Sequence, residues 1–150
     1  MNEEVVLQEW EKDSHLNPLK LVDESLRIPK LHHKYLTLLA KARKISRDIE
    51  GELSILQKEK YILYSQGPSP EDKKKGKWDG SSSFPSKGAA QKSRELNYYI
   101  EGDTDYIAKV KQLGEAKELI TILEEILSSI KTRSFIIRNA LEAHKFNLGE

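Results

Sequence analysis

Apolar residues recur every three or four positions along two long stretches of the chain. In the first stretch this spacing is that of one face of an α-helix, and Pro29 suits a first helical turn. We therefore predict a long helix over about 29–65 with a coiled-coil-like seam. Its apolar or small positions are Leu31, Tyr35, Leu38, Ala42, Ile45, Ile49, Leu53 and Leu56.

The second stretch predicts another long helix, over about 106–146, whose apolar stripe is wider than the first. A helix that is apolar around so much of its circumference needs more than one packing neighbour. We expect it to contact both the first long helix and other copies of the chain. A third, short amphipathic helix is predicted over about 3–13.

The segment between the two long helices has a different composition. Residues 66–94 hold three of the five prolines, four of the eight glycines and several lysines. This composition predicts a flexible basic loop. The sequence thus predicts an all-α protein, a single helical domain over residues 1–150, with long amphipathic helices in a hairpin-like or bundle arrangement.

Charge is unevenly distributed, although the net charge is only +1. Residues 1–26 carry seven acidic and two basic groups, whereas residues 27–60 carry four acidic and nine basic groups. Residues 95–125 are acidic again. Such blocks allow a positive surface for a polyanion beside negative surfaces that could meet basic partners or neighbouring subunits.

Familiar catalytic patterns are missing from the sequence: it has no glycine-rich phosphate loop, no His-Glu-x-x-His and no Gly-x-Ser-x-Gly. The sequence has no cysteine. His32 and His33 point about 100° apart on a helix, so they cannot coordinate one metal ion together. We therefore expect a protein that is not an enzyme and has no cofactor. Without a signal peptide or a long apolar run, it is expected to be cytoplasmic, with no membrane partner.

Basic residues of the first long helix form a candidate nucleic-acid site. At about 100° per residue, Arg43, Lys44, Arg47 and Lys58 fall opposite the apolar stripe. The alternative is a solvated helix face with Glu50 and Glu59 as partners. Lys60 lies about 200° from Lys58, near the apolar stripe, so either it snorkels or the helix does not face a dry core there.

A second basic candidate lies in the predicted loop, where residues 73–78 read KKKGKW. Lysines beside an aromatic ring are typical of sequence-tolerant binders of single strands. A solubilising linker is an equally good reading, and the tyrosines of the chain could pack as easily as stack on bases.

Three stretches resemble one known family. They are residues 36–39 (LTLL), residues 55–67 (ILQKEKYILYSQG) and residues 130–146 (IKTRSFIIRNALEAHKF). In this order and spacing they resemble the UvsY family of recombination mediators of T-even-like phages, and the likeness runs over most of the chain.

This resemblance implies site residues. The family's Lys-x-Arg element, implicated in contact with single-stranded DNA, falls on Lys58 and Lys60, with lysine in place of the arginine. The family stretch associated with ring assembly matches residues 130–135. Together with the wide apolar surface, this makes Ile130, Phe135, Ile137 and Leu141 the expected oligomerisation residues.

The resemblance also implies a mechanism and partners. A ring-like homo-oligomer would bind single-stranded DNA, loosen the phage single-strand-binding protein from it and help to load a phage RecA-like recombinase. Two other readings stay open from the residues alone. One is a coiled-coil structural or adaptor protein that contacts only proteins, and the other is a metal-dependent or acid-base enzyme.

Overall fold

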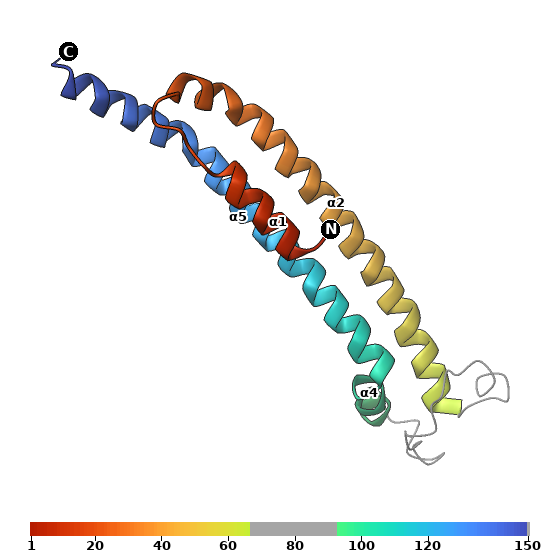
Figure 1. The fold of residues 1–150 in the computed structure, drawn as a ribbon. Helices are drawn as coiled ribbons and strands as arrows, with labels where there is room; N and C mark the ends of the chain where they lie inside the picture. The colour runs from red at the N-terminus through yellow and green to blue at the C-terminus, as the bar shows by residue number, and fades with distance from the viewer. Residues whose placement is uncertain (67–92, 150) are drawn as a thin grey trace. The chain divides into compact units, whose positions relative to one another are not determined.

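The computed structural model describes residues 1–66 and 93–149. The predictions for the loop over 66–94, including the basic run at 73–78, therefore fall almost entirely outside the described residues. The described part consists of four helices and contains no strand. They are α1 (Glu3–Asp13), α2 (Leu21–Gln66), α4 (Ser93–Glu101) and α5 (Thr104–Asn147), shown in Figure 1. The prediction of an all-α protein with two long helices is confirmed.

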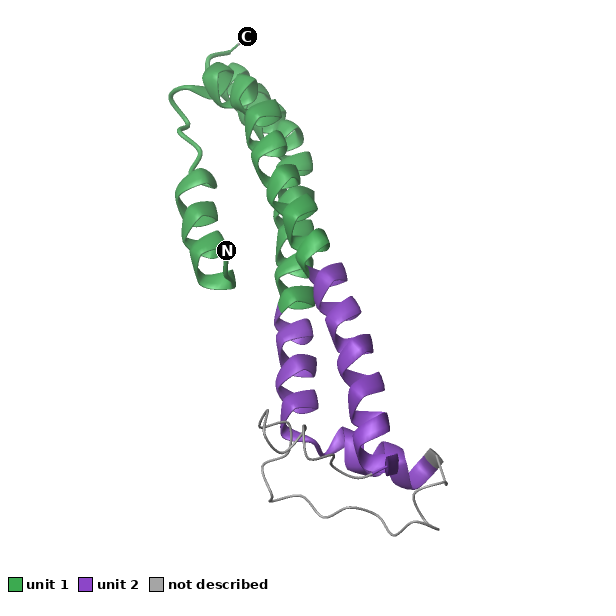
Figure 2. Ribbon diagram, turned by 90° about the vertical axis from the view of Figure 1, so that its right-hand side faces the viewer, with its two compact units in different colours: residues 1–45, 116–150 green, residues 46–115 purple. Residues whose placement is uncertain are grey.

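The chain divides into two compact units, coloured separately in Figure 2. Unit 1 comprises residues 1–45 and 116–150, and unit 2 comprises residues 46–115. Unit 1 packs α1, the first half of α2 and the second half of α5 around one apolar core. The buried residues of this core are Val6, Leu31, Tyr35, Leu39, Ala42, Leu119, Leu123, Ile126, Leu127 and Ile130.

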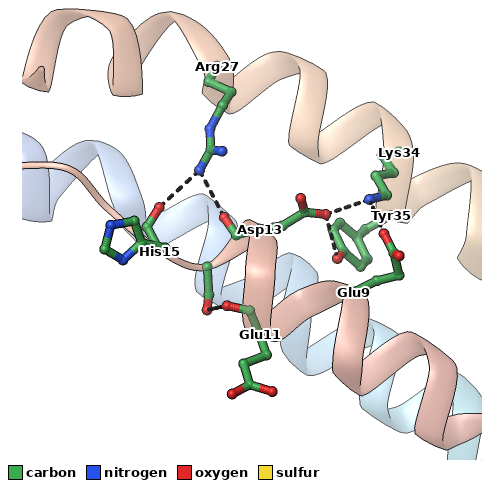
Figure 3. Close-up of polar contacts among 8 residues, drawn as sticks. Glu9, Glu11, Asp13, His15, Arg27, Lys34 and Tyr35 are labelled. Atoms are coloured by element: carbon green, nitrogen blue, oxygen red, sulfur yellow. Dashed lines mark hydrogen bonds and ion pairs between the residues drawn. The ribbon is translucent and has the colours of Figure 1, made fainter.

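Helix α1 is fixed by capping at its start and by polar contacts at its end. The Asn2 side chain accepts a hydrogen bond from the Val5 amide at 2.9 Å, which satisfies one of the open donors of the first turn. At the other end, the Asp13 carboxylate accepts hydrogen bonds from Lys34 Nζ at 2.5 Å and from the Tyr35 hydroxyl at 2.9 Å (Figure 3). Burial works against ionisation of Asp13, but these two bonds prevail and lower the pKa of its carboxyl.

Helix α2 begins eight residues before Pro29, where the sequence predicts its start. A proline inside a helix removes one hydrogen bond and crowds the preceding turn. Here the extra turns are attached by side chains: Arg27 donates to the carbonyl oxygens of Asp13 and His15 at 2.9 and 3.1 Å. These contacts hold residues 21–28 against the end of α1, which the local sequence pattern does not reveal.

A buried arginine of α5 joins the same region. Arg133 donates to the Ser14 carbonyl and lies over the Trp10 ring, 5.7 Å from its centroid. Its guanidinium also lies 3.8 Å from Glu24 of α2. Arg133 therefore links α5 to both other elements of unit 1, and burial together with the nearby Arg27 charge lowers its pKa.

Unit 2 contains the second half of α2, all of α4 and the start of α5. Its core consists of Tyr64, Leu96 and Ile100, with Tyr99 and Tyr106 packed against them. Helix α4 is absent from the sequence prediction because it is short and directly follows the glycine- and proline-rich segment. Its apolar residues at positions 96, 99 and 100 nevertheless have helical spacing and supply most of this core.

Two glycines lie in the interiors of the long helices with open space beside them. Among the described residues, a Cβ atom at Gly51 or Gly114 would meet no atom within 4 Å. Gly51→Ala should therefore raise the free energy of unfolding by about 1 kcal/mol, since glycine costs a helix interior that much relative to alanine. Urea denaturation measures the change. Gly149→Ala is the control that should not raise the free energy of unfolding, because Gly149 has a φ of 76°, a backbone conformation that alanine adopts only with strain. A loss of stability in Gly51→Ala would show that something packs against this position.

Candidate nucleic-acid interface

Four of the predicted basic residues lie exposed on α2. Arg43 and Lys44 belong to unit 1, whereas Arg47 and Lys58 belong to unit 2. Arg47 and Lys58 are eleven residues apart, or about three helical turns, so they project from the same side of α2. Within residues 1–66 and 93–149, no ion pair to Lys44, Arg47 or Lys58 is found. All three side chains are exposed.

Arg43 differs from these three because it has an acidic partner. Its guanidinium lies 3.2 Å from the Glu124 carboxylate of α5, and both side chains are about half exposed. Exposed pairs of this kind contribute little and are screened by salt. Arg43 can therefore exchange Glu124 for a phosphate at small cost.

A groove in unit 1 adjoins this ion pair. It has a volume of about 350 Å³, and its lining includes Leu36, Leu39 and Leu127, with Arg43 and Lys131 among its charged residues. The groove therefore combines an apolar lining with two cations on opposite helices.

Lys60, for which the motif match implies a DNA contact, has a buried side chain in unit 2. Its side chain is only 6% exposed, and its ammonium lies 2.9 Å from Asp105 and 3.3 Å from Asp103. Burial alone would lower the pKa of Lys60, but the hydrogen bond that its ammonium donates to Asp105 and the charges of the Asp103 and Asp105 carboxylates raise it. Lys60 therefore stays charged, and its charge is used inside unit 2.

Asp103 is the centre of this buried network. One of its oxygens accepts hydrogen bonds from the backbone amides of Asp105 and Tyr106, as expected of a residue that caps the start of α5. The other accepts a 2.7 Å hydrogen bond from the Tyr64 hydroxyl. Asp103 is not among the residues predicted from the sequence, although an aspartate between Gly102 and a helical pattern is a capping signal.

The expected oligomerisation residues fall into two groups. Ile130 and Ile137 are 0% and 3% exposed, so they belong to the interior of unit 1. Phe135 and Leu141 are 59% and 37% exposed and face outward, with the Arg138 guanidinium 5.4 Å from the centroid of the Phe135 ring. Every residue from 141 to 149 is exposed, so the described part of the chain leaves the apolar side chains Leu141, Phe146 and Leu148 at the end of α5 uncovered.

The described residues were also compared with the requirements of a metal site and of a membrane-spanning helix. In residues 1–66 and 93–149, no group of three or more histidine, aspartate or glutamate side chains could hold a metal ion. Within the same ranges, no helix has the length and apolar character needed to cross a membrane.

Comparison with known proteins identifies the family. No curated protein matches the chain. The crystal structure of the bacteriophage T4 recombination mediator protein UvsY is similar to this fold, with a TM-score of 0.77 and 22% sequence identity, over 99% of this chain and 98% of that one. The sequence profile described as "Recombination, repair and ssDNA binding protein UvsY" matches residues 9–150. This chain therefore belongs to the UvsY family of recombination, repair and single-stranded DNA-binding proteins.

Proposed function

We propose that this protein is a recombination mediator that binds single-stranded DNA as a homo-oligomer and helps to load a phage RecA-like recombinase. In this proposal it acts on strands covered by the phage single-strand-binding protein. The observation that carries the DNA-binding part is the pair Arg47 and Lys58, exposed on one side of α2 without an ion-pair partner among the described residues. In unit 1, Arg43 and Lys44 are further exposed cations that could contact phosphates.

Self-association would increase the number of phosphate contacts that one particle makes with a strand. One helix face contacts few phosphates, but linked copies convert each further contact into an intramolecular event and raise the total affinity strongly. The uncovered apolar end of α5, with Leu141, and the exposed Phe135 support association between copies. The mediator would thus compete for the strand through many weak contacts that can be released one after another.

The DNA-binding proposal predicts a change in salt dependence. Arg47→Ala together with Lys58→Ala should weaken binding to every single-stranded oligonucleotide. Each lost phosphate contact should also lower the slope of log affinity against log salt by about 0.7. Fluorescence anisotropy with a labelled oligonucleotide at several salt concentrations measures both quantities.

Lys111→Ala is the matched control, because Lys111 is an exposed lysine of α5 in the same unit. It should leave the slope nearly unchanged. If affinity and slope survive the double substitution, the interface on α2 is wrong. If the unmodified protein shows no salt-dependent binding, a protein that contacts only other proteins becomes the better account.

The loading step has its own test. The protein should accelerate assembly of the recombinase of the same phage on strands already coated with that phage's single-strand-binding protein. It should give little acceleration on bare strands. Equal acceleration on both would argue for a general stabiliser of recombinase filaments.

A further inference from the structure

One tyrosine of unit 2 is exposed although its neighbours are packed. Tyr98 of α4 is 77% exposed, whereas Tyr64 is 3% exposed and Tyr99 is half-buried. By helical periodicity, Tyr98 points away from the buried residues Leu96 and Ile100. The core of unit 2 therefore does not account for its ring.

Tyr98 is nevertheless held in place, because it is the outer member of a series of three rings. Its ring meets that of Tyr99 edge to face, with centroids 5.8 Å apart and an interplanar angle of 86°. The Tyr99 ring in turn lies 5.7 Å from the buried ring of Tyr64 at 35°. We call Tyr98, Tyr99 and Tyr64 the tyrosine series.

The inner end of the tyrosine series is anchored by the buried ion pairs. The Tyr64 hydroxyl donates to Asp103, whose same oxygen lies 3.3 Å from the Lys60 ammonium. An exposed ring supported in this way loses less conformational entropy when a flat ligand stacks on it than a freely rotating side chain does. This rigid support distinguishes Tyr98 from an ordinary surface tyrosine.

Charged groups beside Tyr98 are mixed in sign. Arg94 lies one turn before Tyr98 on the same outward side of α4, and Glu101 lies about one turn after it. Arg94 can pair with a phosphate adjacent to a stacked base, whereas Glu101 opposes a strand that continues past it. The approach of a strand is thus favoured from the Arg94 side.

We propose that Tyr98 is a stacking site for the unpaired bases of single-stranded DNA. This inference rests on the strand-binding part of the proposed function and adds to it a contact that is not electrostatic. Every nucleobase has a flat aromatic face, so stacking on tyrosine tolerates any sequence. Removal of such a ring weakens binding by about 5- to 150-fold per stacked base.

Affinities for a thymidine oligonucleotide and for an abasic strand of the same length test the proposal. Tyr98→Ala should weaken binding to the thymidine strand at least about fivefold, with an unchanged salt slope. The abasic strand should bind weakly and respond little to Tyr98→Ala. Tyr98→Phe should keep the affinity of the unmodified protein.

Tyr61→Ala is the matched control. Tyr61 is a 51% exposed tyrosine of α2 in the same unit, and within the described ranges it makes no ring contact. It should change affinity much less than Tyr98→Ala.

Three results would overturn the stacking site while leaving the proposed function intact. These are an unchanged affinity in Tyr98→Ala, an equal loss on the abasic strand, and a fall in particle mass that marks Tyr98 as an interface between copies. Equal losses in Tyr61→Ala and Tyr98→Ala would overturn the role of the tyrosine series. If the unmodified protein binds neither strand, the proposed function and the stacking site fail together.

Discussion

Lys60→Ala should lower the free energy of unfolding by about 3–5 kcal/mol, because it leaves a buried carboxylate without its cation. Asp103 is 8% exposed and would keep its bonds from Tyr64 and the start of α5, but it would lose the ammonium that is paired with it in the described part of the chain. The lost lysine stem would also leave space inside unit 2. Urea denaturation followed by circular dichroism, at fixed protein concentration, measures the change.

Lys58→Ala is the matched control for this prediction, because it removes a lysine two residues away that is exposed. It should change stability by no more than about 0.5 kcal/mol. Lys60→Met combined with Asp103→Asn should cost less than the sum of the two single substitutions, since neither partner is then left as a lone charge. Equal, small effects of Lys58→Ala and Lys60→Ala would mean that Lys60 is exposed in solution.

The two long helices could be predicted from the sequence because the apolar periodicity of each extends over about seven turns or more. The start of α2 could not be predicted, because it depends on contacts with distant residues. Pro29 is a good first residue of a helix by local rules, yet Arg27 and Glu24 bind groups of α1 and α5 and extend α2 backwards. Local preference is overridden by tertiary contacts of this kind.

The exposure of the candidate DNA-binding residues could be predicted only in part. Periodicity alone places Arg47 and Lys58 on the polar side of α2, and both are exposed. The same periodicity places Lys60 beside the apolar stripe, but it does not identify the carboxylates that pair with the buried ammonium. Asp103 and Asp105 lie more than forty residues away in sequence, across a segment whose geometry no local pattern determines.

Apolar residues of α5 also differ in exposure, and the apolar pattern of the sequence does not reveal which of them are buried. Ile137 and Leu141 are one turn apart, and both belong to the predicted oligomerisation surface. The former is 3% exposed and the latter 37% exposed. Because of this difference in exposure, substitution of Ile137 should affect the stability of the chain, whereas substitution of Leu141 should affect association between chains.

Ile137→Asp should lower the free energy of unfolding by about 4–5 kcal/mol, since it replaces a buried side chain with an unpaired charge and leaves a cavity. Leu141→Asp is the matched partner. It places the same charge at an exposed position and should cost the isolated chain no more than about 1 kcal/mol. Circular dichroism should therefore show a much larger fall in helicity or in the midpoint of unfolding for Ile137→Asp than for Leu141→Asp.

For Leu141→Asp, which should stay folded, the expected change is a lower particle mass. If copies associate through the uncovered end of α5, Leu141→Asp should shift the mass seen by light scattering toward the 17.2 kDa of one chain, with helicity retained. The charge would then sit in a desolvated contact between copies, where it costs several kcal/mol. A folded Leu141→Asp variant with unchanged mass would exclude Leu141 from the contact. A monodisperse monomer of the unmodified protein at micromolar concentration would remove self-association from the mechanism altogether.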